Sequence, residues 1–178
     1  SHALDANTTG DDNTAIGDNA LGANTTAAKN TAVGSGALTV NITGDLNTAV
    51  GYNALATNTV GDRSVAVGYQ ALLTQEPSSN TDMLNTAVGF DAMKVSTTGV
   101  QNASFGSYSL DANTTGSYNV AVGVNALSAN TTASHNVAVG VVALAANTTG
   151  ASNVAVGNYA LDANTTASNN IGIGYAAL

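Results

Sequence analysis

Hydrophobic and polar positions recur along this chain in a fixed pattern. Each unit begins with a short segment such as Asn136-Val137-Ala138-Val139, in which alternate positions are alike, and the segment stops at a glycine, Gly140. A period of two in β-branched residues, ended by glycine, predicts a short strand. The second half of the unit, 143–149, is less regular, and its Asn-Thr-Thr-Gly ending predicts a second strand that runs into a turn.

The glycine that ends the first segment returns every 17 residues, with one step of 21. The glycines in register are Gly17, Gly34, Gly51, Gly68, Gly89, Gly106, Gly123, Gly140, Gly157 and Gly174. Self-similarity at a fixed period is typical of solenoids and arrays. Because two strands and two turns make one coil, we expect an all-β chain folded as a parallel β-solenoid (β-roll) of about ten coils, stacked about 4.8 Å apart.

The repeat covers 1–178, which we interpret as a single domain with a loop insertion at 73–84, where the longer step falls. Leu4 and Leu178 hold the same position in their units, so the sequence starts and stops within a repeat. Isolated solenoids usually need capping segments. None is visible at either end, which favours a segment of something longer or a unit that stacks end to end.

Two columns of large aliphatic side chains are predicted to form the core. The residue before each glycine gives Val33, Val50, Val67 and Val139, and the residue after each second alanine gives Leu38, Leu55, Leu127 and Leu144. A column of asparagines, including Asn13, Asn30 and Asn47, is expected to bond side chain to side chain between coils.

The predicted core is thin, because each coil supplies only two large apolar side chains against the entropy lost in ordering its backbone. The first strand position also changes along the chain, from Thr14 and Thr31 to Val137 and Val154. This change indicates either tighter packing toward the C-terminus or a face pressed against sister chains. We therefore expect association with further copies.

Composition narrows the possible functions. Charged residues make up 8% of the chain, against a typical share of roughly 25%. Three basic and eleven acidic residues give a net charge of -8, so the chain is not expected to bind nucleic acid. It has no cysteine for a disulfide or thiolate site, and its longest apolar run, 139–146, is too short to insert into a membrane.

Catalysis finds no support in the sequence. His2 and His135 hold different positions in their units, and no nucleophile can be grouped with a base and an orienting acid. We therefore expect no enzyme, no catalytic residues and no cofactor. Asp11, Asp45 and Asp62 could stack their carboxylates around Ca²⁺, but other residues replace them elsewhere, so we favour a solvated turn and no metal site.

The Asn-Thr-Thr segments allow two further interpretations. Several asparagines open Asn-x-Thr sequons, and turn chemistry is favoured over glycans for this column: Asn7, Asn24, Asn41, Asn113, Asn130, Asn147 and Asn164. Repeated threonines also suggest ice binding. Alternation places the two threonines on opposite faces, which argues against a flat hydroxyl array, and ice binding stays an alternative.

Two features are candidates for receptor contact. Tyr52, Tyr69 and Phe90 hold one position on three successive coils, where aromatic rings could stack on sugars or simply on one another. The insertion includes Glu76, Pro77 and Asn80. Insertions leave a solenoid as loops and often carry its binding function.

The repeated segments resemble known families. Asn-Val-Ala-Val-Gly at 136–140 and Asn-Thr-Ala-Val-Gly at 47–51 resemble the head repeats of trimeric autotransporter adhesins. The longer form, which continues to Ala-Leu and Asn-Thr-Thr-Gly, resembles repeats of phage tail fibres and bacterial surface proteins. The resemblance covers nearly the whole chain and implies a left-handed β-roll, a homotrimer and a location outside the cell or on a virion.

We therefore expect a structural and adhesive segment of a trimeric surface adhesin or tail fibre. Its partners would be further copies of itself and a glycan or protein of a host surface. The alternatives are a filament subunit that stacks head to tail through exposed strand edges and an ice-binding solenoid.

Overall fold

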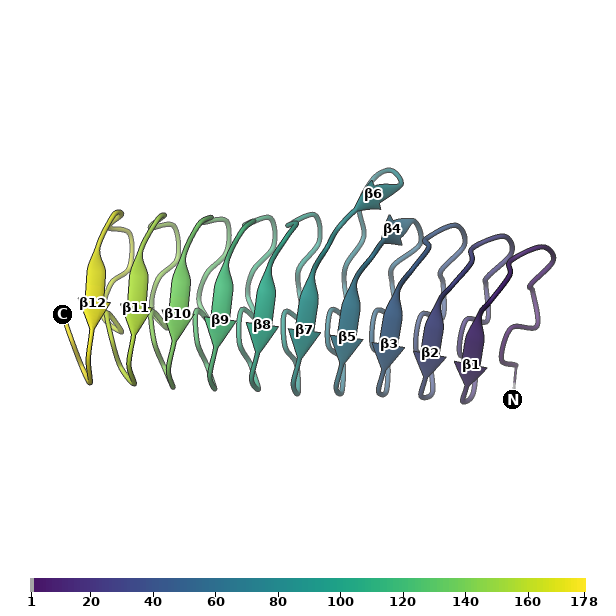
Figure 1. Cartoon of the computed structure of the whole chain (residues 1–178), viewed down its shortest axis with the longest axis horizontal. Helices are drawn as coiled ribbons and strands as arrows, with labels where there is room; N and C mark the ends of the chain where they lie inside the picture. The colour runs from purple at the N-terminus through teal and green to yellow at the C-terminus, as the bar shows by residue number, and fades with distance from the viewer. Residues whose placement is uncertain (1) are drawn as a thin grey trace.

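The chain forms a rod of stacked coils (Figure 1). The computed structural model describes residues 2–178, in which all regular structure is β-strand and no helix occurs. Ten strands form one parallel sheet along the rod, in the order β1-β2-β3-β5-β7-β8-β9-β10-β11-β12. The prediction of an all-β parallel β-solenoid is confirmed.

The strands of this sheet lie immediately before the repeated glycine. They are β1 (Thr14–Ile16), β2 (Thr31–Val33), β3 (Thr48–Val50), β5 (Val65–Val67), β7 (Thr86–Val88), β8 (Ala103–Phe105), β9 (Val120–Val122), β10 (Val137–Val139), β11 (Val154–Val156) and β12 (Ile171–Ile173). Corresponding residues of successive units pair, as Ala138 does with Ala155. Across the longer step, Val67 pairs with Val88, so the extra residues leave the register intact. Two short strands beside the insertion, β4 (Gly61–Asp62) and β6 (Thr81–Asp82), also pair in parallel.

The core is built from alanine and leucine, not from valine and leucine. Leu38, Leu55, Leu127 and Leu144 have no exposed surface, as expected for core residues. The strand residue that faces them is the central alanine, such as Ala138, which is also fully buried.

The prediction that the valine column belongs to the core was wrong. Val33, Val50, Val67 and Val139 are only half-buried, because each strand turns its central alanine inward and its two flanking residues outward. The leucines that cross the interior from the opposite wall leave room for no more than a methyl group on the strand side. The valines therefore lie on the outer face of the sheet.

The predicted second strand of each coil is also absent. Within 143–149 the structure has turns, and Leu144 has a φ of 51°, in the left-handed region that ends a strand. The same φ recurs at the other leucines of the column, for example 50° at Leu38. This conformation brings two successive side chains, Ala143 and Leu144, into the core. Burial of the leucine offsets the cost of the left-handed backbone, about 1–2 kcal/mol.

The repeated glycine is required by the close approach of successive coils. Gly51 has a φ of 136°, and a Cβ atom there would lie 2.3 Å from the carbonyl oxygen of Gly68. A side chain at this position would collide with the backbone of the next coil. The glycine spacing that revealed the repeat is therefore a steric requirement of stacking.

One edge of the core is polar and holds two columns of buried amides. In the column that precedes the strands, the backbone N–H of Asn136 donates to Oδ1 of Asn119 at 3.0 Å, and Nδ2 of Asn119 donates to the carbonyl of Ala133 at 2.9 Å. This column bonds mainly from side chain to backbone. The expectation of a side-chain-to-side-chain ladder at Asn13, Asn30 and Asn47 was therefore wrong.

The second column, formed by the Asn-Thr-Thr asparagines, makes the side-chain ladder. Asn130 donates from Nδ2 to Oδ1 of Asn113 at 2.9 Å and to the carbonyl of Ala133 at 3.0 Å. One carbonyl per coil thus accepts from both columns, as Ala133 does from Asn119 and Asn130. Each buried amide is satisfied only when the neighbouring coil is in place.

The assignment of the core makes a prediction for stability. Leu127→Ala should lower the free energy of unfolding by about 2–5 kcal/mol, because it leaves a cavity between coils. Val50→Thr, on the half-buried outer face, should cost clearly less than Leu127→Ala, because it leaves no cavity in the core. Urea unfolding followed by circular dichroism measures both, and equal losses would contradict the assignment.

A defect in the amide ladder makes a second prediction. Ser96 replaces asparagine in this column, and its buried Oγ has no hydrogen-bond partner among the described residues. Ser96→Asn should raise the melting temperature, because the new amide can reach the carbonyl of Gly99, which corresponds to the Ala133 carbonyl that accepts from Asn130. Asn130→Ser is the matched reverse change and should lower the melting temperature. An unchanged or lower value for Ser96→Asn would show that the ladder does not stabilise the stack.

Candidate interaction surfaces

The structure offers surfaces, not an enclosed site. Among residues 2–178 we find no pocket and no group of three or more acidic, histidine or cysteine side chains placed to hold a metal ion. In the same residues, no helix has the length and apolar character needed to cross a membrane.

The most extended surface is the outer face of the ten-stranded sheet, defined by the two outward residues of each strand. The first column is Thr14, Thr31, Thr48, Val65, Thr86, Ala103, Val120, Val137, Val154 and Ile171, and the second is Ile16, Val33, Val50, Val67, Val88, Phe105, Val122, Val139, Val156 and Ile173. Neither column contains a charged residue. Phe105 and Val122 remain 42% and 37% exposed, so the face presents large apolar side chains to solvent.

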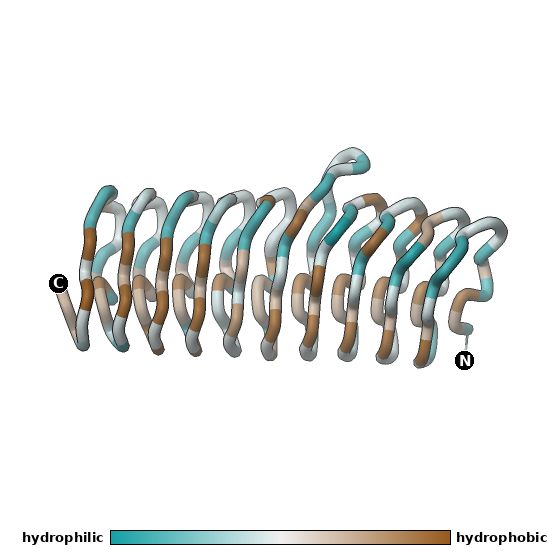
Figure 2. Tube along the Cα trace, in the orientation of Figure 1, coloured by the Kyte–Doolittle hydropathy of each residue, from teal (hydrophilic) through white to brown (hydrophobic). Residues whose placement is uncertain are grey.

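The outer sheet face becomes more apolar toward the C-terminal end of the rod. Figure 2 shows two hydrophobic bands on the strands near the C-terminus and one on those near the N-terminus. The difference comes from the first column, which changes from Thr31 and Thr48 to Val137 and Val154. Charged residues also become rarer toward the C-terminal end. Asp162 is the only Asp, Glu, Lys or Arg between 113 and 178.

The aromatic row forms a continuous stack. The ring centroids of Tyr52 and Tyr69 lie 5.4 Å apart and those of Tyr69 and Phe90 lie 4.9 Å apart, with interplanar angles of 15° and 6°. These rings are 43–49% exposed. Because the rings cover one another's faces, the row presents mainly ring edges and two hydroxyl groups to solvent. This geometry favours hydrogen bonding at the hydroxyls over stacking of sugar rings on aromatic faces.

The insertion leaves the rod as a loop beside β4 and β6 (Figure 1). Glu76 is exposed at its base, where its carboxylate accepts from the backbone N–H of Thr59 at 3.1 Å and from the Thr59 hydroxyl. Asn80 is exposed immediately before β6, whereas Pro77 is buried. Glu76 and Asn80 are therefore accessible to a partner, and burial argues against Pro77 as a contact.

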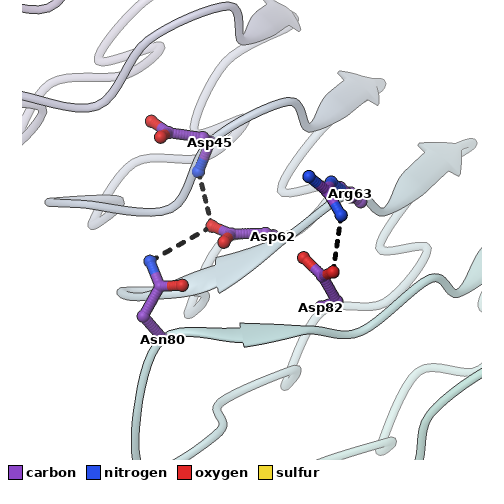
Figure 3. A network of polar contacts seen from close by, with 5 residues as sticks. All are labelled: Asp45, Asp62, Arg63, Asn80 and Asp82. Carbon is purple, nitrogen blue, oxygen red and sulfur yellow. Dashed lines mark hydrogen bonds and ion pairs between the residues drawn. The ribbon is translucent and has the colours of Figure 1, made fainter.

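A polar network ties the loop to the coil before it (Figure 3). Oδ1 of Asp62 accepts from the backbone N–H of Asp45 at 2.7 Å and from Nδ2 of Asn80 at 3.4 Å. Arg63 and Asp82 form an exposed ion pair at 2.5 Å. Contacts of Glu76, Asn80 and Asp82 thus hold the loop to the preceding coil.

The structure does not bring the two candidate receptor features together. Tyr52 follows the end of β3 after one glycine, whereas the insertion precedes the start of β7. Since all strands of the sheet run parallel, the ends and the starts of strands lie at opposite edges of the coil. A ligand that contacts both features would have to wrap around the rod.

Several polar residues serve the stack itself. Asp45 accepts from the backbone N–H of Ala28 at 2.7 Å, so its carboxylate bridges two coils in the way that the Ser134 hydroxyl does when it accepts from the backbone N–H of Ser117. The sequon residues Asn24 and Asn130 are fully buried, which is incompatible with a glycan on their side-chain nitrogen. The hydroxyl of Thr114 donates to the carbonyl of Thr131 at 3.0 Å and is thus used within the rod.

Two carboxylates on successive coils interact, that of Asp91, which is buried, and that of Asp111, which is half-buried. Asp91 and Asp111 lie on successive coils in the positions of Asn19 and Thr39, whose side chains hydrogen-bond at 2.6 Å. Oδ1 of Asp91 and Oδ1 of Asp111 are buried without a hydrogen-bond partner among the described residues. Lys94 contacts the other oxygen of Asp91 at 3.1 Å. Burial is the main cause that raises the pKa of Asp111, and the charge of Asp91 raises it further.

This pair makes a prediction for pH dependence. Because the folded-state pKa of Asp111 is raised, the folded chain binds the proton more tightly, and stability falls as the pH rises from about 3.8 through the folded-state value. Asp111→Asn should therefore lose less melting temperature than the wild type between pH 4 and pH 7. Asp162→Asn is the control, because Val142 takes the place of Asp91 on the preceding coil. Equal pH dependence in wild type and Asp111→Asn would contradict the assignment.

In comparisons with known proteins, no family model matches the chain, and neither does any curated protein or solved structure. The functional argument therefore depends on the fold and on the surfaces described above.

Sequence reasoning recognised the outer sheet face only in part: the change from Thr31 to Val154 suggested a face packed against other copies as one alternative, but the valine column was assigned to the interior. The signal was present in the central strand position, where alanine or another small residue recurs between two larger residues. In a two-walled coil, the side with only small residues is the one that faces an opposing wall of leucines.

Proposed function

We propose that this chain is a structural and adhesive segment of an extracellular fibre, such as a surface adhesin or a phage tail fibre, and that it works as a homotrimer. The observation that supports the proposal most strongly is the outer sheet face, an uncharged surface of mostly β-branched side chains along the rod. Large exposed apolar surfaces mark sites of association. In such a fibre the loop and the aromatic row would lie at the sides, and the proposed contacts with a host-surface glycan or protein are Tyr52, Tyr69, Phe90, Glu76 and Asn80.

The alternatives have less support from particular contacts. Ice binding through the Asn-Thr-Thr column is disfavoured because hydroxyls such as that of Thr114 already donate to the neighbouring coil. Head-to-tail filaments would use the strand edges at the ends of the stack, and an association experiment distinguishes them from a closed oligomer.

The experiment is a measurement of molar mass by size-exclusion chromatography with light scattering, over protein concentrations from about 1 to 100 μM. We expect a discrete species of three times the 17.4 kDa of one chain. Polymers that lengthen with concentration would favour the filament. A mass of 17.4 kDa throughout would overturn self-association.

A further inference from the structure

The ion pair of Lys94 and Asp91 lies in the turn that follows β7 and differs from an ordinary surface pair. Nζ of Lys94 lies 3.1 Å from Oδ2 of Asp91, three residues earlier in the chain. Asp91 is only 8% exposed, and its Oδ1 is buried without a hydrogen-bond partner among residues 2–178. A carboxylate in this position is costly, because it is removed from water and only one of its two oxygens is compensated.

The carboxyl group of Asp111 lies beside this pair on the next coil. The backbone N–H of Val95 donates to the carbonyl of Asp111 at 3.3 Å, and the corresponding side chains of an earlier pair of coils, Asn19 and Thr39, hydrogen-bond directly. Oδ1 of Asp111 is also buried without a partner in the described part of the chain. Burial raises the pKa of Asp111, and the charge of Asp91 raises it further, so both favour the protonated form. A proton on Asp111 satisfies both unpaired oxygens, since its O–H can donate to Asp91.

The backbone holds these groups in fixed positions. The N–H of Asp91 donates to the carbonyl of Tyr69 on the preceding coil at 2.9 Å, and the N–H of Met93 donates to that of Ser109 on the following coil at 3.0 Å. Met93, next to the lysine, is fully buried in the core. Groups oriented within one molecule react with effective molarities that reach about 10⁵–10⁸ M. This advantage opposes the equilibrium that, in water, favours a separate amine and carboxylate.

We propose that Lys94 and Asp91 condense to an intramolecular isopeptide bond, with Asp111 as the proton carrier. The ammonium of Lys94 gives a proton to the Asp91 carboxylate, and the nitrogen lone pair then forms a bond to Cγ of Asp91. Asp111 protonates an oxygen of that carboxyl group and recovers a proton as the intermediate collapses, so it ends protonated as it began. The Cγ–O bond breaks, and its electron pair leaves with the oxygen as water. One ammonium and one carboxylate thus become one amide and one water, and no oxidant or reductant is needed.

The reaction removes the buried charge of Asp91 from beside Asp111 and closes the turn that carries Met93 into the core. Closure of a loop by a covalent bond restricts the unfolded chain and so stabilises the fold. All three reacting groups belong to one chain, so the proposal does not depend on self-association. The bond would form in a monomer as well as in an oligomer.

The combination of residues occurs in one unit of the repeat. Lys94 is the only lysine at its position, which threonine or leucine holds in other units, as at Thr39 and Leu73. The ion pair of Arg63 and Asp82 has no such chemistry, because a guanidinium stays protonated and both side chains are exposed.

The test is the intact mass of the full chain, measured by mass spectrometry after incubation at neutral pH and denaturation. We expect the wild type to be lighter than its sequence mass of 17.4 kDa by the mass of one water molecule. Trypsin should cut the denatured chain after Lys29 and Arg63 but not after Lys94, whose nitrogen is acylated. Fragmentation of the resulting peptide should place the missing water within residues 91–94.

Two variants serve as controls, and circular dichroism verifies that each is folded. Lys94→Arg keeps the positive charge but forms no amide, and Asp111→Asn keeps the shape of the side chain but carries no proton, so both should show their full sequence masses. A wild type at its full sequence mass, or a loss of water that persists in Lys94→Arg, would overturn the proposal. A bond from residue 94 to residue 111 would overturn Asp91 as the acceptor. Complete reaction of Asp111→Asn would overturn the role of Asp111.

Discussion

Hydrogen bonding of buried amides between coils is the constraint on which the rest of the structure depends. Most coils place two asparagine side chains at the polar edge of the core, and their partners belong partly to a neighbouring coil. A buried amide without a partner costs about 1–3 kcal/mol. A shift of one residue between coils would leave these groups unpaired, so the amide columns fix the register that the three-residue strands alone could not.

The constraint also explains the shape of the coil. With amides at one edge and a glycine turn at the other, the interior has room only for alanine on the sheet side and leucine on the opposite side. The larger β-branched residues are therefore placed on the outside, where they form a flat, uncharged face. A thin core and an exposed apolar face have the same origin, and both favour association with other copies.

Much of the fold could be predicted from the sequence, because the glycine spacing reports a steric contact that every coil makes. Whether each strand residue points into the core or to the outside could not be predicted as reliably as the fold. Val139 and Ala138 both fit a strand of period two, and only the presence of Leu144 on the opposite wall decides which of them fits inside. The left-handed leucines were equally hidden, since leucine gives no local signal for a positive φ.

The candidate surfaces were predicted unevenly for similar reasons. The aromatic row and the insertion were visible as departures from the repeat, so Tyr52, Tyr69 and Asn80 could be singled out by position. Burial of Pro77 depends on how the loop folds back onto the rod, which composition does not determine. The pairing of Asp91 with Asp111 required knowing that the side chain at one position reaches three positions further along on the next coil.

Native-state hydrogen exchange at the backbone amide of Asn136 tests the central claim most directly, because its acceptor is the side-chain oxygen of Asn119. Exchange at Asn136 should be slower than at the exposed Thr132 by about 10³-fold or more, as for a bond that opens only when coils separate. Asn119→Ala should remove this protection at Asn136 before that of the neighbouring strand. Exchange of Asn136 in the wild type at the rate of an unfolded chain would contradict the account.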